Sequence, residues 1–295
     1  MGKLKGEYII LQNEQFYLKG YKDFANERLK IEDYRGNIEH IFSTIRKLQK
    51  EDYVHKTIVK CRTKSVPSFL GQGYMLEGCI PGYFLGGDAY FLCKYHDQKR
   101  FTSSMWVEED KQLEEVWKKD GDIENKGVIT PSIRKATTLD AKKLATFYAS
   151  VFPIYPVPID NPDYVKDQME ENTIFYCIET DGQIIAAASA EINMAYRNAE
   201  ITDCATLSSH RKGGYMYDII QSLENELVSK GIFCSYSIAR ALSFGMNAVL
   251  HKSGYSYQGR LKNNCYIYDK IEDMNVWSKD LSALSAGKSA LSAGN

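Results

Sequence analysis

One segment, residues 200–230, constrains the fold more than any other part of the sequence. It reads as a strand at 200–207, a loop that contains Gly213 and Gly214, and a helix at 215–230 with its apolar residues on one face. Glycine lets a backbone approach a ligand without a Cβ clash, and the first N–H groups of a helix lack partners within it. Such a junction suits a pyrophosphate, which the helix dipole also attracts. The alternative interpretation is a tight turn that binds nothing.

The pattern around this junction predicts an α+β fold. Neither G-x-x-x-x-G-K-[ST] nor G-x-G-x-x-G is present, so the loop is neither a P-loop nor the usual dinucleotide-binding turn. Four prolines make 152–162 an irregular loop. The other expected elements are a strand at 132–136, a helix through Leu144 and Val151 capped by Thr138 or Asp140, a helix at 163–171, a hairpin of 174–179 with 183–192, a strand at 233–239, a helix at 243–253, and a final strand pair at 255–261 and 265–269.

Length and local composition predict the domain organisation. A chain of 295 residues suits two compact domains. The charged stretch after Glu108 predicts a short surface helix around Leu113, Val116 and Trp117, followed by a linker, and the repeated SALSAG near the C-terminus cannot supply a core. We therefore expect an N-terminal α/β domain at 1–107, a helix and linker at 108–130, a second domain at 131–281 and a disordered tail at 282–295.

A short motif occurs in both domains. Gly73-Tyr74 and Gly78 recur with the same spacing as Gly254-Tyr255 and Gly259. In each copy a strand (56–61 or 233–239) and a short helical segment come before the motif, and an aromatic strand (89–93 or 265–268) follows it. This order indicates a degenerate half-domain repeat, with a chance match of a small motif as the alternative.

Composition excludes several classes of partner. The formal net charge is −1, which gives no basic excess for nucleic acid or anionic lipid, and no apolar run approaches the ~20 residues of a membrane-spanning helix. The seven cysteines form no C-x-x-C pair and the five histidines show no metal-binding spacing. We expect a cytoplasmic protein with reduced thiols, no bound metal, and no nucleic-acid or membrane partner.

The order of elements at 131–281 resembles the GNAT acetyltransferase superfamily. In that superfamily an R/Q-x-x-G-x-G/A loop after the fourth strand binds the pyrophosphate of acetyl-CoA. Here the loop reads Arg211-x-x-Gly214-x-Met216, and Met216 departs from the small residue of the pattern. The resemblance implies a central mixed sheet flanked by helices.

Several separate strings extend this resemblance to the bacterial and archaeal β-lysine N-acetyltransferases. They are YPVPIDNPDYV at 155–165, TDCAT at 202–206, ARALSFGMN at 239–247, GYSYQGRLKNN at 254–264 and EDMNVWSKDL at 272–281, together with the IPGYF and KY segments of the N-terminal region. The resemblance implies acetylation of the ε-amine of β-lysine to Nε-acetyl-β-lysine, a compatible solute. It also implies a pathway link to a lysine 2,3-aminomutase, acting one step earlier.

The same resemblance implies acetyl-CoA as the acetyl donor. We expect a backbone N–H near Thr206 or Leu207 to bind the thioester oxygen. The candidate cofactor-binding residues are Thr206, Leu207, Ser208, Arg211, Lys212, Gly213, Gly214, Tyr215 and Met216.

Acetyl transfer to an amine requires a base, because an ε-ammonium has an ordinary pKa of ~10.4. The GNAT resemblance places a glutamate base at Glu200, and Asp203 is the second candidate. In a regular strand Asp203 would point to the opposite face. The tyrosine that many GNAT enzymes use as general acid is replaced by Leu250, which leaves His251, Tyr255 or solvent for that role.

Candidate substrate contacts follow from the chemistry of β-lysine. Arg240 would bind the carboxylate, Tyr155 would cover the aliphatic chain, and Asn263 and Asn264 would offer polar contacts. Two alternatives stay open. One is a GNAT enzyme for another small amine, a polyamine or a protein lysine, and the other is a non-catalytic acyl-CoA-binding module.

Overall fold

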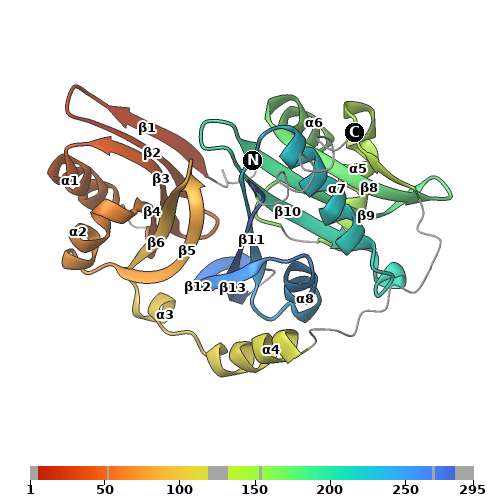
Figure 1. Ribbon diagram of the computed structural model, residues 1–295. Coiled ribbons are helices and arrows are strands. Elements are labelled where there is room, and N and C mark those ends of the chain that lie inside the picture. Colours follow the sequence, from red (N-terminus) through yellow and green to blue (C-terminus); the bar gives the residue numbers. More distant parts are fainter. Residues whose placement is uncertain (1–5, 52, 119–131, 153–154, 268–269, 283–295) are drawn as a thin grey trace, which may run out of the picture.

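The computed structural model describes residues 6–51, 53–118, 132–152, 155–267 and 270–282, and they build one 13-stranded sheet (Figure 1). The strand order is β1-β2-β3-β4-β6-β5-β12-β13-β11-β10-β9-β8-β7. The N-terminal half of the chain supplies the first six strands of this order and the C-terminal half supplies the rest. The predicted mixed sheet with flanking helices is confirmed.

The N-terminal half consists of strands and short helices. They are β1 (Glu7–Gln12), β2 (Phe16–Asp23), β3 (Arg28–Gly36), α1 (Ile38–Leu48), β4 (Lys56–Arg62), α2 (Val66–Gly71), β5 (Met75–Phe84), β6 (Gly87–Tyr95) and α3 (Gln98–Phe101). Helix α4 (Trp106–Lys118) follows.

The C-terminal half carries the longer helices. Its elements are β7 (Ile133–Lys135), α5 (Ala141–Val151), α6 (Pro162–Glu171), β8 (Thr173–Thr180), β9 (Gln183–Asn193), β10 (Asn198–Thr206), α7 (Tyr215–Ser229), β11 (Cys234–Arg240), α8 (Phe244–Lys252), β12 (Ser256–Ile267) and β13 (Lys270–Asp280). Asp140, one of the two expected caps, is the N-cap residue of α5, and Thr138 is not. The side chain of Asp140 also forms a capping box with Thr137 at the start of the preceding 3-10 turn.

The two halves share one strand order. The sequence β1-β2-β3-β4-β6-β5 in the first half matches β8-β9-β10-β11-β13-β12 in the second, and β3–β4 and β10–β11 are the parallel pairs. The repeated glycines have the same roles: Gly73 and Gly254 have φ of 79° and 83°, and each ends a helix. Each is followed by a tyrosine whose N–H returns to that helix, at Phe69 O and Leu250 O.

The two halves meet where Gly78 and Gly259, the last glycines of the two repeated motifs, lie next to each other. Gly78 on β5 pairs with Gly259 on β12. A Cβ at Gly259 would lie 2.3 Å from the carbonyl oxygen of Glu77 and 2.6 Å from the Cα of Gly78, so no larger residue fits without moving the backbone. The motif spacing therefore reflects a close contact between the two backbones.

Two strand predictions are wrong. Residues 256–267 form one bulged strand instead of two, and its antiparallel partner is β13, which the sequence did not predict. The counterpart of β6 is therefore β13 and not 265–268. Residues of β13 are buried from Asp273 to Ser278, so the alternation that marks a half-buried strand is absent there.

The hydrophobic core does not divide cleanly between the halves. One buried cluster combines Ile58, Ile80 and Phe91 of the first half with Leu261 and Val276 of the second. The boundaries at 107, 130 and 281 therefore stay a proposal. Of the expected helix and linker at 108–130, residues 119–130 lie outside the described residues, as do residues 283–295 of the expected tail at 282–295.

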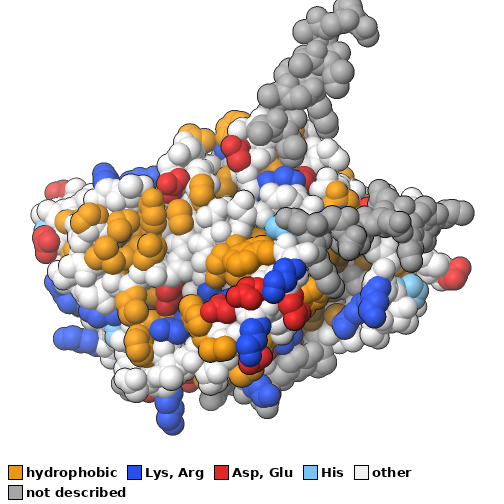
Figure 2. All heavy atoms as spheres, turned by 60° about the horizontal axis from the view of Figure 1, so that its bottom comes forward, with side chains coloured by type: hydrophobic (Ala, Val, Ile, Leu, Met, Phe, Trp, Pro, Cys, Tyr) orange, Lys and Arg blue, Asp and Glu red, His pale blue; other side chains and the backbone are white. Residues whose placement is uncertain are grey.

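Helix α4 is charged outside and apolar inside. Leu113 and Val116 are buried in the core cluster that also contains residues of α7 and α8, while Trp117 is 45% exposed. Figure 2 shows acidic and basic side chains close together, next to hydrophobic ones, on the face that carries this helix. Within the described ranges, no helix has both the length and the apolar composition needed to cross a bilayer.

Candidate active site

The parallel strands β10 and β11 pair over three residues only. The ladder joins Asn198, Ala199 and Glu200 to Cys234, Ser235 and Tyr236. Beyond it the strands continue without further pairing, and the Ser237 hydroxyl donates to the Ile201 carbonyl across the space between them (2.8 Å). Backbone groups of β10 past this point are therefore available on the β11 side.

The loop from β10 to α7 leaves the helix N-terminus open. Gly214 is the N-cap of α7 with φ of 79°, and among the described residues no side chain caps it. Helix α1, at the matching place in the first half, is capped by Asn37, whose side chain accepts from the N–H groups of Glu39 and His40. The two helix starts thus differ in their ability to accept an anion.

The predicted cofactor loop is exposed to solvent. Ser208, Arg211, Lys212, Gly213 and Gly214 are all exposed, so two cationic side chains lie beside the open N-terminus. The next residue, Tyr215, is half-buried and begins α7. The loop therefore has the charge and the accessibility that a pyrophosphate requires.

The position of Met216 in the structure explains why a large residue stands where the motif has a small one. Its side chain is buried in the core cluster that α7 covers, and 9% of it is exposed. A large residue at this position therefore fills the core of the domain.

Of the two backbone N–H groups expected to bind the thioester oxygen, one already donates a hydrogen bond within the sheet. The N–H of Leu207 donates to the carbonyl oxygen of Ile185 on β9 (2.9 Å), so Leu207 is not available as a donor. Hydrogen-bonded and non-hydrogen-bonded pairs alternate along an antiparallel ladder. Thr206, which pairs with Ala186, therefore directs its N–H away from β9, toward the side where β11 has separated.

Glu200 lies in a row of polar side chains across three strands. It pairs with Glu191 on β9 and with Tyr236 on β11, and residues in register project from the same face of a sheet. Burial, Glu200 and Asp203 together raise the pKa of Glu191 to about 8. Sequence reasoning missed Glu191, because nothing in the pattern of β9 distinguishes it from an ordinary polar strand residue.

Asp203 points to the same face as Glu200, which corrects the expectation for a regular strand. A bulge between Thr202 and Ala205 interrupts β10, and Asp203 has φ of 51°. Its carboxylate accepts a hydrogen bond from Ser189 Oγ (2.6 Å). Ser189 lies two residues before Glu191 on β9 and so projects from the face that Glu191 and Glu200 share.

Tyr155 reaches this site from the proline-rich loop. Its hydroxyl is hydrogen-bonded to Asp203, and its ring stacks on Phe152 with centroids 4.6 Å apart. Burial raises the pKa of Asp203, and the hydrogen bonds from Ser189 and Tyr155 act in the opposite direction. The structure thus brings together Tyr155, Asp203 and Glu200.

The other predicted substrate residues have different partners. Arg240 forms a two-pronged ion pair with Glu272, with both N–O distances 2.7 Å. The Asn263 amide donates to the carbonyl oxygens of Arg100 and Thr102, and the Asn264 carbonyl accepts from Arg28 and Arg100. The asparagine contacts join the halves of the protein, whereas Arg240 and Glu272 both belong to the second half. We therefore leave these three residues out of the proposed substrate site.

The position of the usual general acid and one of the alternatives to it, Tyr255, lie in the core. Leu250 is fully buried. The Tyr255 hydroxyl contacts Ser235 Oγ at 2.6 Å and is hydrogen-bonded to Glu224, whose carboxylate pairs with Lys279. Tyr255 therefore belongs to a buried polar network behind the site.

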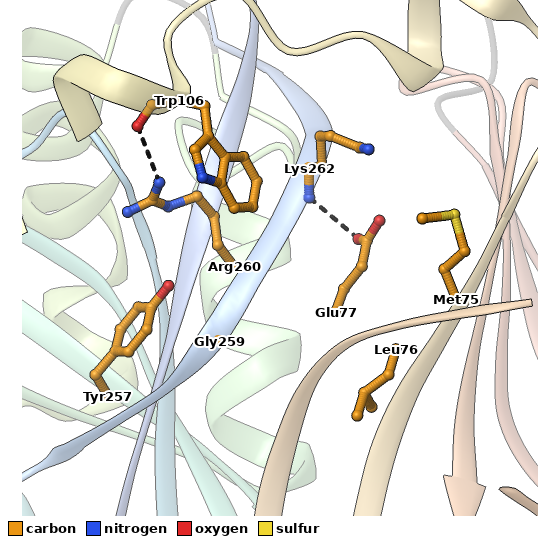
Figure 3. A pocket seen from close by; sticks show the side chains of 8 residues that line it. All are labelled: Met75, Leu76, Glu77, Trp106, Tyr257, Gly259, Arg260 and Lys262. Carbon is orange, nitrogen blue, oxygen red and sulfur yellow. Dashed lines mark hydrogen bonds between the residues drawn. The ribbon is translucent and has the colours of Figure 1, made fainter. Parts of the chain in front are cut away.

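A pocket of about 310 Å³ lies at the junction of β5, β12 and α4 (Figure 3). Arg260 contacts Asp110 at 2.8 Å, Glu77 pairs with Lys56 at 2.7 Å, and the Lys262 ammonium lies 4.0 Å from the centre of the Phe101 ring. The residues that line it are Met75, Leu76, Glu77, Trp106, Tyr257, Gly259, Arg260 and Lys262. They include none of the residues predicted for catalysis or cofactor binding.

A parallel strand pair that separates beyond a glutamate, followed by a glycine loop and an open helix N-terminus, defines the GNAT class of N-acetyltransferases. The model of the Acetyltransferase (GNAT) family matches residues 142–255. N-acetyltransferase YodP of Bacillus subtilis (strain 168) is 38% identical over 88% of this chain and 94% of its own length. Beta-lysine N(6)-acetyltransferase of Methanosarcina mazei is 32% identical over 84% of this chain and all of its own. The chain belongs to the β-lysine N-acetyltransferase family, and it is an N-acetyltransferase.

Among solved structures, an N-acetyltransferase from Staphylococcus aureus Mu50 is similar to one part of the chain. It has 21% sequence identity and a TM-score of 0.45, and the match covers 51% of this chain and 98% of that one.

Proposed function

We propose that this acetyltransferase transfers the acetyl group of acetyl-CoA to the ε-amine of β-lysine. The observation that supports the substrate is the similarity to the Methanosarcina mazei enzyme over nearly the whole length of both chains. The open N-terminus at Gly214, with Arg211 and Lys212 beside it, fits the pyrophosphate of the acetyl donor.

In this proposal the side chains of β10 and the residues around them divide the work. The Glu200 carboxylate takes a proton from the ε-ammonium, directly or through water, so that the amine can attack the thioester carbonyl. The Thr206 N–H stabilises the negative charge that develops on the carbonyl oxygen. Tyr155, held by Asp203, covers the aliphatic chain of the substrate. The C–N bond forms as the carbonyl electrons move onto oxygen, and the C–S bond then breaks as the carbonyl re-forms. The second proton of the amine passes to the departing thiolate or to solvent, which gives free CoA thiol and the amide.

The proposed product is Nε-acetyl-β-lysine, which has no net charge at neutral pH and suits a compatible solute. Its precursor must come from a reaction that moves the α-amine of lysine to the β-carbon. A lysine 2,3-aminomutase performs that reaction, and we include it in the proposal as the preceding step.

A screen of amines tests the proposed function. The purified chain is incubated with acetyl-CoA and, in turn, β-lysine, α-lysine, 1,5-diaminopentane and a lysine-containing peptide, and release of free thiol is measured. We expect kcat/KM to be highest for β-lysine, with mass spectrometry placing the acetyl group on the ε-nitrogen.

Three results would contradict the proposal. Equal use of α-lysine or of the diamine would point to a broader amine acetyltransferase, and modification of the β-nitrogen would exclude the assigned regiochemistry. Binding of acetyl-CoA without turnover on any amine would favour an acyl-CoA-binding module.

A further inference from the structure

We propose that the N-terminal half of the chain completes the substrate site: Lys30, Glu32 and Lys60 form a charged triad that binds the amino-acid end of the substrate, opposite Glu200. This inference rests on the proposed function, because it assigns one end of β-lysine to each half of the protein.

The triad lies on one face of β3 and β4. Lys30 and Glu32 are two residues apart on β3, and their side chains therefore share a face. Lys60 Nζ is 2.5 Å from one Glu32 carboxylate oxygen, and Lys30 Nζ is 3.3 Å from the other. Two cations on one carboxylate leave the triad with an excess of one positive charge.

The triad continues into a row of tyrosines. Lys30 pairs with Tyr21 on β2, and Tyr21 pairs with Tyr8 on β1, so all three side chains project from the same face. The ammonium of Lys30 lies 5.7 Å from the centre of the Tyr21 ring. The first half therefore presents aromatic and cationic groups together.

This face is turned toward the catalytic face of the second half. Lys60 Nζ lies 5.8 Å from the centre of the Tyr236 ring, and Tyr236 is the residue in register with Glu200. Lys60 also donates to the hydroxyl of Tyr83 (3.1 Å), whose ring centre is 5.6 Å from that of Tyr236. The Asn198 side chain donates to the carbonyl of Tyr83 (2.7 Å), which ties β5 to the start of β10.

Electrostatic effects agree with this geometry. The carboxylate of Glu200 contributes to raising the pKa of Lys60, and Lys30 and Lys60 both act to lower the pKa of Glu191. Glu191 is exposed to water, yet the loss of hydration is the largest cause of its raised pKa. The charged groups of the two faces therefore lie close enough to influence one another.

Equivalent positions of the two halves carry different residues at the proposed site. Glu27 and Arg197 have φ of 51° and 52°, and each carbonyl accepts N–H groups from two consecutive residues at the start of the next parallel strand. These residues therefore occupy equivalent places, and three positions further on Lys30 stands where the second half has Glu200. The first half carries a cation at the position of the base, and Asn37 caps its helix.

The chemistry of the triad matches the far end of β-lysine. This substrate carries an ammonium and a carboxylate on neighbouring carbons, separated from the ε-amine by methylene groups. The carboxylate would pair with the ammonium groups of Lys30 and Lys60, and the β-ammonium with Glu32 or Glu191. The ε-amine then lies toward Glu200.

The test compares β-lysine with 1,4-diaminopentane, which keeps the amine spacing and lacks the carboxylate, in Lys60→Met and Lys30→Met variants. The matched control is Lys56→Met: Lys56 is also on β4 and also pairs with a glutamate, Glu77 (2.7 Å), but its ammonium donates to the Lys262 carbonyl (2.6 Å) and has no contact with Glu32. We expect the two triad variants to raise KM for β-lysine at least ten-fold more than KM for the diamine. Lys60→Arg should recover most of the affinity, and the control should change both KM values equally.

Other outcomes overturn the inference in distinguishable ways. Equal effects on both substrates, or the same discrimination in Lys56→Met, would make the triad a structural feature. If the unmodified protein rejects β-lysine, the proposed function fails, and the comparison is repeated with the best amino acid of the amine screen and its decarboxylated analogue. A preference for carboxylate-free amines in that screen would also exclude the triad as a carboxylate site. Calorimetric titration with acetyl-CoA, expected to be unchanged, verifies that each variant is folded.

Discussion

Glu200 and Asp203 lie three residues apart on β10, yet their surroundings suit them to different roles. Asp203 is buried, and its carboxylate already accepts hydrogen bonds from Ser189 and Tyr155. Glu200 is half-buried, between Glu191 and Tyr236 in the row that faces Lys60. A base must reach an amine that enters from solvent, so we assign proton removal to Glu200 and the positioning of Tyr155 to Asp203.

Replacing the proposed base should separate these roles. We expect Glu200→Gln to lower kcat by about 10²–10⁴-fold, the usual scale for loss of a general base. Its affinity for acetyl-CoA should remain, and the defect should shrink at high pH, where more free amine is present. Steady-state kinetics from pH 7 to 10 measures both effects. A Glu200→Gln enzyme near full activity beside an inactive but folded Asp203→Asn enzyme would transfer the role to Asp203.

The pKa of Glu191 predicts a pH dependence of stability. Since folding raises this pKa from its ordinary value of 4.5 to about 8, the folded protein holds a proton that the unfolded chain has released in that interval. Stability should therefore fall as pH rises from about 5 to 8. Glu191→Gln should flatten this part of the profile, as measured by urea unfolding at several pH values. An unchanged slope would show that Glu191 is ionised in the folded protein at neutral pH.

At the scale of secondary-structure elements, the start of α7 distinguishes the C-terminal half from the N-terminal half. Residues 207–214 separate β10 from α7, whereas Asn37 alone separates β3 from α1. The longer connection places Arg211 and Lys212 beside an uncapped helix, and the shorter one fills the helix start with a side chain. An anion can approach only the first of these without displacing a hydrogen bond.

A matched pair of glycines tests the cofactor loop. Gly214 and Gly182 have φ of 79° and 78°, and an added Cβ would have nothing within 4 Å at either position. Alanine at either site should therefore cost similar backbone strain, about 1–2 kcal/mol. We expect Gly214→Ala to weaken acetyl-CoA binding at least ten-fold by calorimetry and Gly182→Ala, in the turn between β8 and β9, to leave it unchanged. Equal affinities in the two variants would remove the pyrophosphate from this loop.

Local sequence patterns predicted the junction at 200–230 and most elements of the C-terminal half, because strand, loop and helix there follow one another with clear periodicity. They did not predict β13, whose residues are buried on both faces. The bulge at Asp203 was also missed, since a single left-handed residue leaves no periodic signal. The approach of Lys60 to Tyr236 depends on how distant strands fold over one another, which no local pattern encodes.

On the scale of the whole molecule, two halves with one strand order share a single sheet and part of one core. The pairing of Gly78 with Gly259 and the mixed cluster around Ile80 and Val276 hold them together. The proposed catalytic carboxylates and the proposed cofactor loop lie in the second half, and the charged triad lies in the first. Neither half has a complete substrate site in this arrangement.

The duplicated fold should bind a single donor molecule. Because Asn37 caps α1 and β3 leads almost directly into it, only the loop before α7 offers an open helix start of the two equivalent ones. We expect one acetyl-CoA per chain in calorimetric titration, and none in a chain that carries a bulky residue at Gly214. A second binding event, of any affinity, that survives this change would assign cofactor binding to the first half.

Because the start of α1 is capped, the two halves should tolerate substitutions differently during evolution. Once one copy of a duplicated unit no longer holds the donor, substitutions on its inner face alter the choice of acceptor without disturbing the chemistry in the other copy. Positions 30, 32 and 60 are then free to diversify, while Glu200 and Gly214 are constrained. Variants selected in the laboratory for a new amine should accumulate their first changes on β3 and β4.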